Sequence, residues 1–411
     1  MKKSANDSHD FLKKEHLRNQ VGILGVHATY FALDIFVSIF LVSQLLSISD
    51  GNLSMVALFY AMCWGGVILM FWLFSYVVKK FSRVWCIRVS TIGVLASIIL
   101  VLLFQESLAE YYLLLGAIYG LSIGIYWCSM HTFTSEAMGG KKMAGYTTWF
   151  IGTSTFVRVV IPLTLGAIIK FVDFAAAAAI ATGLAVVLLM FTLILRDQRK
   201  SAQGFSMRAF FRYIKERDIS KAVWTQFWIQ TLYGIMILAS VSTTILVAIT
   251  FNDDFTLGYL TSIFAGASII TLTCYKAIRS PRAKVCVLYI LSALPFLGAV
   301  GLLFGLSPVT VILCQAGFLT FKTAANSEFE RTRLNLMADF GAEHLHTEGL
   351  LFTESAFALA RAFGLGVILV AYFTNTFYLF QVFVVTVLGG LLVGVVLLNL
   401  WTKRWLTVHK S

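Results

Sequence analysis

The sequence predicts an all-α membrane protein with twelve transmembrane helices, and three observations lead to this fold class. Apolar residues make up 59% of the chain and charged residues only 13%, whereas soluble domains contain roughly 45–50% and about 25%. The apolar residues form repeated runs of the ~20 residues that a helix needs to cross a bilayer. Finally, if these runs cross a membrane, almost all of the basic residues lie on the same side of it.

The apolar runs are long and continuous, unlike the short alternating strands of a membrane barrel, so each is expected to form a helix. All six cysteines lie in or beside these runs, and their spacing fits neither a metal site nor a disulfide framework. We therefore expect no cofactor and no metal site. The predicted spans are 21–46, 54–78, 85–104, 111–135, 146–169, 175–195, 222–250, 256–275, 284–304, 308–326, 349–373 and 376–401.

The loop charges predict the orientation of the chain. Of the 32 lysines and arginines, all but three belong to the termini and to the loops on the same side as the termini. Lys170 is alone in the opposite loops, and Arg158 and Arg361 lie inside spans. By the positive-inside rule both termini are cytoplasmic. We expect a monomer in the inner membrane of a bacterial cell. The formal charge of +12 is spread over short clusters, so we expect the lipid bilayer and no nucleic acid as a partner.

The longest segment without spanning potential divides the chain into two sets of six spans. The expected parts are a cytoplasmic segment 1–20, a first bundle 21–195, a linker 196–221, a second bundle 222–401 and a tail 402–411. Within the linker, apolar and basic side chains alternate in a pattern that suits the anionic cytoplasmic leaflet. A solvated linker that only tethers the two bundles is the alternative.

The two halves repeat a basic motif after the second and eighth spans. One copy contains Lys80 and Arg83, and the other contains Arg279 and Arg282, each pair with a turn-forming residue between its members. Such internal duplication is typical of transporters.

The first copy resembles the major facilitator signature Gly-x-x-x-Asp-Arg/Lys-x-Gly-Arg/Lys. Lys80 and Arg83 match its basic positions, serines replace its glycines, and Lys79 stands where the family has its aspartate. An ion pair centred on that aspartate therefore cannot be carried over. The resemblance implies two pseudo-symmetric six-helix bundles, a cavity lined by helices 1, 4, 7 and 10, and a gating role for Lys80, Arg83, Arg279 and Arg282.

Ionisable side chains within the spans are the strongest site markers, because each costs at least ~2.5–3.5 kcal/mol in mid-span unless it faces the bundle interior. His27, Tyr30 and Asp34 share one face of the first helix. A carboxylate and an imidazole in a partly dehydrated cleft are suited to proton coupling. For His27, a hydrogen bond to a neighbouring helix is the alternative.

Arg158 and Arg361 occupy equivalent positions in the two halves. A guanidinium binds carboxylate or phosphate through a planar fork of donors, so two of them facing one cavity would clamp an anion. Glu354 lies on the same helix face as Arg361 and is a candidate competing carboxylate. The alternative is that each arginine is held by an acidic residue and only joins helices. Lys322, near the expected end of the tenth span, is expected to extend to the membrane interface.

Neutral polar and aromatic side chains mark the remaining cavity-lining helices. The fourth span places an aromatic ring beside an imidazole, which suits a sugar, an aromatic or an amphiphilic solute, although ordinary helix packing is the alternative for Trp127. The candidate solute-binding residues are Arg158, Arg361, Tyr30, Tyr126, Trp127, Gln226, Gln230, Tyr233 and Gln315, and the candidate proton-coupling residues are Asp34, His27, His131 and Glu354.

We therefore expect a proton-coupled secondary transporter of a small organic anion or zwitterion, such as a carboxylate, a siderophore or a phosphorylated compound. The chain has no phosphate-binding loop of an ATPase and no nucleophile and base at catalytic spacing, so an ion gradient is the expected energy source and an enzyme is not expected. The antiporter motif of drug exporters is matched only by Pro162 and Gly166. Export of drugs or amphiphilic lipids, and a non-transporting sensor or assembly factor, remain as alternatives.

Overall fold

The computed structural model describes residues 2–138, 142–196, 204–342, 345–373 and 377–408. Every regular element in these ranges is a helix, and twelve of the helices are long and apolar enough to cross a membrane. The predicted fold class and the number of spans are thereby confirmed.

The first half begins with one long helix that contains a wide, π-helical turn. Such turns are frequently found at functional sites. The elements of this half are α1 (Lys2–Ile35), the π-helix η1 (Phe36–Leu41), α2 (Val42–Ile48), α3 (Leu53–Lys80), α4 (Arg83–Leu103), the 3₁₀ turn η2 (Gln105–Ser107), α5 (Leu108–Met138), α6 (Lys142–Phe171) and α7 (Phe174–Ile194).

The second half follows a short helix that connects the bundles. Asp253 caps the second spanning helix of this half: its carboxylate accepts hydrogen bonds from the hydroxyl and the backbone N–H of Thr256, and these bonds hold the pKa of Asp253 below its ordinary value. The elements are α8 (Met207–Glu216), α9 (Ser220–Phe251), α10 (Asp254–Ala277), α11 (Pro281–Leu302), α12 (Pro308–Ala342), α13 (His346–Phe373) and α14 (Phe377–Val408).

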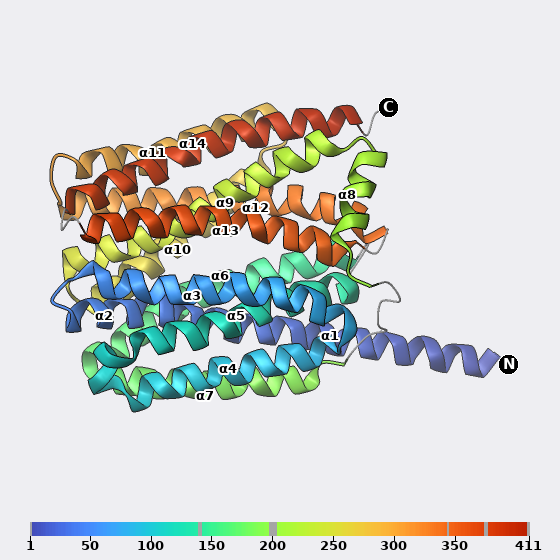
Figure 1. The fold of residues 1–411 in the computed structure, drawn as a ribbon, viewed down its shortest axis with the longest axis horizontal. Coiled ribbons are helices and arrows are strands. Elements are labelled where there is room, and N and C mark those ends of the chain that lie inside the picture. Colours follow the sequence, from blue (N-terminus) through green and yellow to red (C-terminus); the bar gives the residue numbers. More distant parts are fainter. Residues whose placement is uncertain (1, 139–141, 197–203, 343–344, 374–376, 409–411) are drawn as a thin grey trace.

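The spanning helices run side by side along the long axis of the molecule (Figure 1). Both termini lie at one end of this array, which we call the terminal face, and the other end is the distal face. The short helix α8 crosses the ends of the spanning helices at the terminal face (Figure 1). This is the face that the loop charges predict to be cytoplasmic.

Glycines allow the closest helix contacts, within and between the halves. A Cβ atom on Gly120 of α5 would collide with the backbone of Cys63 on α3. Between the halves, α6 packs on α10 and α3 packs on α13. A Cβ atom on Gly258 of α10 would collide with the backbone carbonyl of Pro162 on α6. Close packing of small residues is therefore what joins these helices.

The tenth span was expected at 308–326, and the apolar span found there is Pro308–Phe329, although the helix α12 that contains it continues to Ala342. One expectation about local structure is wrong. The apolar face of the linker was expected to contact lipid or solvent. Instead Phe210 and Ile214 of α8 are buried against the bundle.

Candidate functional site

Helices α1 and α5 bring their predicted residues together in an aromatic cluster. The Tyr30 and Tyr126 rings stack with centroids 4.1 Å apart, and Trp127 lies edge-on to Tyr30 at 5.3 Å. His131 stacks on Trp127 at 4.9 Å. The aromatic cluster comprises His27, Tyr30, Phe31, Tyr126, Trp127, His131 and Phe150. Phe31 and Phe150 were missed, because phenylalanine is too common in these spans to be a signal.

His27 is buried inside the aromatic cluster. A hydrogen bond of 3.1 Å joins its Nδ1 atom to the hydroxyl of Tyr126 on α5, and its ring lies 4.9 Å from that of Phe150. This bond is the contact with a neighbouring helix that stood as the alternative role of His27.

Three charged groups meet between the halves, and we call them the charged triad: Asp34 on α1, Arg158 on α6 and Lys322 on α12. The Asp34 carboxylate interacts electrostatically with both cations. The Arg158 guanidinium lies 5.5 Å from the centroid of the Phe31 ring. The triad contains residues of both halves, and each member is partly exposed.

Lys322 does not extend to the interface as expected. Its Nζ atom donates a hydrogen bond to the Ser240 hydroxyl on α9 at 3.0 Å and lies 5.6 Å from the Phe318 ring centroid. Lys322 stands before the end of the apolar span at Phe329, and its ammonium group bonds to α9 instead of extending to that end.

Arg361 is paired on its own helix. Its Nη1 atom lies 2.5 Å from Oε1 of Glu354. In contrast, neither Arg158 nor Lys322 forms a direct ion pair with a residue that the structure describes. The charged triad thus contains two cations and one carboxylate.

The predicted glutamines are buried without hydrogen-bond partners. Both amide atoms of Gln226 and of Gln230 on α9, and Oε1 of Gln315 on α12, have no partner in the described part of the chain. Tyr233 packs against the rings of Phe329 and Phe357. These residues lie on α9 and α12, the two helices that also carry Ser240 and Lys322.

The gating motif is rearranged. Lys80, Arg279 and Arg282 are exposed and Arg83 is buried. The ion pair at this face is made instead by Lys79, whose Nζ atom lies 2.7 and 2.8 Å from the two carboxylate oxygens of Glu348 on α13. The residue at the position of the family's aspartate thus forms an ion pair with reversed polarity.

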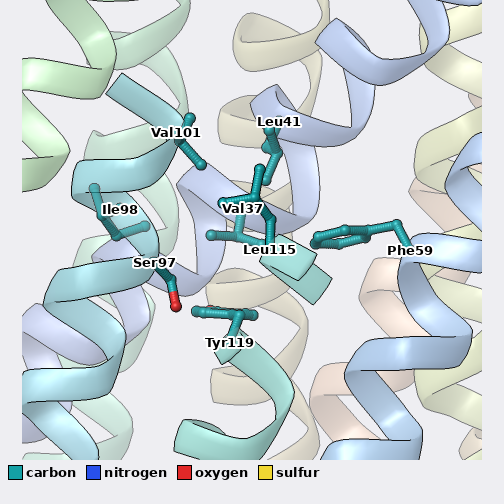
Figure 2. A pocket seen from close by; sticks show the side chains of 8 residues that line it. All are labelled: Val37, Leu41, Phe59, Ser97, Ile98, Val101, Leu115 and Tyr119. Atoms are coloured by element: carbon teal, nitrogen blue, oxygen red, sulfur yellow. The ribbon is translucent and has the colours of Figure 1, made fainter. Parts of the chain in front are cut away.

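A small apolar cavity of about 10 Å³ lies beside η1 (Figure 2). It has room for about one water molecule, so it is too small for an organic solute. Its lining residues come from η1, α3, α4 and α5 and are Val37, Leu41, Phe59, Ser97, Ile98, Val101, Leu115 and Tyr119.

Solved transporter structures share this architecture. The structure of a bacterial homologue of the iron transporter ferroportin aligns with a TM-score of 0.62 and 16% identity, in its inward-facing and its outward-facing state alike, over 95% of this chain and 99% of that chain. A bacterial metal transporter aligns with a TM-score of 0.58 and 17% identity over 95% of this chain and 98% of the other. The nucleoside transporter NupG aligns with a TM-score of 0.58 and 15% identity over 94% and 99%.

At these identities the likeness to solved structures shows the fold alone, and none of the curated proteins matches the chain in sequence. The family model is more specific, since it matches residues 21–330, which is most of the chain. Together with the twelve spans, this match shows that the chain belongs to the Major Facilitator Superfamily and is a membrane transporter.

Proposed function

We propose that the protein is a proton-coupled secondary transporter of a small organic anion or zwitterion, such as a carboxylate, a siderophore or a phosphorylated compound. The charged triad is the observation that carries this proposal. Arg158 and Lys322 come from opposite halves, and the single carboxylate of Asp34 lies within electrostatic range of both.

The triad has the chemistry of an anion site. The Arg158 guanidinium offers a planar fork that binds carboxylate or phosphate in a bidentate manner, and the Lys322 ammonium adds a compact point charge. When Asp34 is ionised, its carboxylate competes with a solute anion for these two cations. When Asp34 takes up a proton, the cations are free for the solute. Solute anion and proton therefore bind together, which couples solute movement to the proton gradient.

Metal transport is not part of the proposal, although a bacterial homologue of the iron transporter ferroportin and a bacterial metal transporter share the fold. In the part of the chain that the structure describes, no group of three or more His, Cys, Asp or Glu side chains is placed to hold a metal ion.

The test uses the purified protein, first in a thermal-shift screen and then in proteoliposomes. The screen compares carboxylates, phosphate monoesters and siderophores with neutral amide analogues of the same size. We expect anions to raise the Tm and neutral analogues to leave it unchanged. Active anions are then tested for uptake with and without an inward proton gradient. Equal stabilisation by an anion and its neutral analogue would contradict the anion site.

The substitution Arg158→Lys tests whether the guanidinium group binds the anion through two donors, because it keeps the charge and removes the bidentate geometry. We expect anion uptake to fall by about tenfold or more, as charge-assisted hydrogen bonds are worth ~1.5–3 kcal/mol. Arg208→Lys is the matched control, since Arg208 is exposed on α8. Loss of uptake in both variants would point to a general effect on the protein.

Export of an amphiphile is the second candidate, because Phe31, Trp127 and Phe150 of the aromatic cluster are only partly buried. Phe31 also lies under the Arg158 guanidinium. Transport of a cationic lipophilic dye that survives Arg158→Lys would favour this candidate. A non-transporting sensor would show no counterflow of any solute.

A further inference from the structure

We propose that the linker between the two halves is part of the gate at the terminal face and does not merely tether the bundles. In this arrangement the linker holds the buried Lys79–Glu348 ion pair in place through Phe205, Ser206 and helix α8. The linker must move away from this position before the terminal face opens. The proposal does not depend on which solute is transported.

The ion pair joins the two halves and is shielded from water. Lys79 is the penultimate residue of α3 and Glu348 lies in the first turn of α13. Their side chains are 4% and 0% exposed. Opening this face by separating α3 from α13 would break this contact between the halves.

The linker holds the same carboxylate as Lys79. The backbone N–H of Ser206 donates a hydrogen bond to Glu348 Oε1 at 2.8 Å. The ring of Phe205 lies 6.0 Å from Lys79 Nζ and edge-on to Tyr76 at 6.5 Å. Three segments far apart in the sequence therefore meet at Glu348: the end of α3, the start of α13 and the linker.

Helix α8 also packs into an apolar cluster, which we call the apolar seal. The fully buried Phe210 ring lies 4.9 Å from that of Phe340 on α12 and 5.7 Å from that of Phe352 on α13. The same apolar cluster contains Phe71 and Cys128, from α3 and α5 of the other half. The rings that Phe210 contacts belong to the second half, whereas Phe205, directly before α8, lies beside Tyr76 and Lys79 of the first half, so the linker as a whole contacts both halves.

Cys128 provides a reporter for the opening of this seal. It is a free, buried thiol in the cluster that contains Phe210. The experiment uses the full chain with the other five cysteines replaced by alanine, purified in detergent so that both faces are accessible. The measured quantity is the rate at which a water-soluble maleimide labels Cys128, without any solute.

We expect slow labelling in the parent protein and labelling faster by at least about tenfold in Glu348→Gln, because that change removes the carboxylate that pairs with the buried Lys79 ammonium group. The charge swap Lys79→Glu with Glu348→Lys restores the ion pair, so it is expected to label more slowly than either single variant. Lys276→Gln, at an exposed lysine near the end of α10, is the matched control and is expected to label at the parent rate.

The linker is tested separately by Phe210→Ala, with Phe211→Ala as control because the Phe211 side chain is 47% exposed. We expect faster labelling in the first variant and no change in the second. If Phe210→Ala labels at the parent rate while Glu348→Gln labels faster, the linker is only a tether and the proposal is overturned. Parent-rate labelling in Glu348→Gln overturns the ion-pair lock as well. A single symmetric peak in size-exclusion chromatography identifies folded variants. If Glu348→Gln aggregates, Glu348→Asp replaces it.

Discussion

Lys322 of α12 donates its hydrogen bond to Ser240 of α9, at 3.0 Å, and so to a neutral acceptor. A hydroxyl holds the ammonium group in place without neutralising it. The charge therefore acts on Asp34 and Arg158 of the other half, with which Lys322 interacts electrostatically.

Lys322→Met is expected to weaken anion binding by about tenfold or more, because it removes one of the two cations of the charged triad while keeping the length of the side chain. Lys322→Arg keeps the charge and is expected to retain most of the affinity. Titration of the anion identified in the thermal-shift screen measures the Kd. Ser240→Ala is the control, since it removes only the neutral partner. Unchanged affinity in Lys322→Met would exclude Lys322 from the site.

Asp34→Asn is expected to make anion binding independent of pH. In the parent protein, protonation of Asp34 frees Arg158 and Lys322, so the anion binds more tightly as the pH falls. The amide cannot ionise, and the variant remains in the binding-competent charge state at every pH. Binding measured at two pH values and uptake with and without a proton gradient check this expectation. Accumulation that still follows the proton gradient would contradict the role of Asp34.

Glu354→Gln is expected to lower stability, since it leaves the Arg361 guanidinium buried without its carboxylate. Removal of one partner of a buried ion pair costs ~3–5 kcal/mol. The double variant Glu354→Gln with Arg361→Met removes both charges and is expected to recover most of the loss. Thermal unfolding of the three variants measures the effect. If the single change tightens anion binding at unchanged Tm, Glu354 is a competitor for the solute and not a structural partner.

Gly258→Ala is expected to lower the Tm, because the added Cβ atom collides with the Pro162 carbonyl where α10 packs on α6. The backbone cannot move aside as a flexible side chain would. Gly266→Ala, on the same helix with open space around it, is the matched control and is expected to leave the Tm unchanged or to raise it slightly. Equal Tm changes in the two variants would show that helix propensity, and not the contact between the halves, decides the effect.

Helix periodicity predicted which side chains share a face, and this was sufficient to place Asp34, Arg158 and the aromatic residues of α1 and α5. His27 and Tyr126 lie 99 residues apart in the chain. Each was nevertheless identified, because a histidine or a tyrosine in the middle of an apolar span stands out from its neighbours. Phe31 and Phe150 carried no such signal. Lys322 was misplaced because hydropathy shows how near a side chain lies to the end of a span and not which neighbouring helix it contacts.

The sequence by itself determined the membrane location, the number of spans and the ionisable groups within them, because the cost of burying polar groups in lipid acts on every residue locally. Only the tertiary structure decided which charges meet. Lys79 and Glu348 are separated by 269 residues, and Arg361 pairs within its own helix while Arg158 does not. Such pairings depend on how whole helices pack against one another, and this packing arises from many small contacts that no single residue pattern contains.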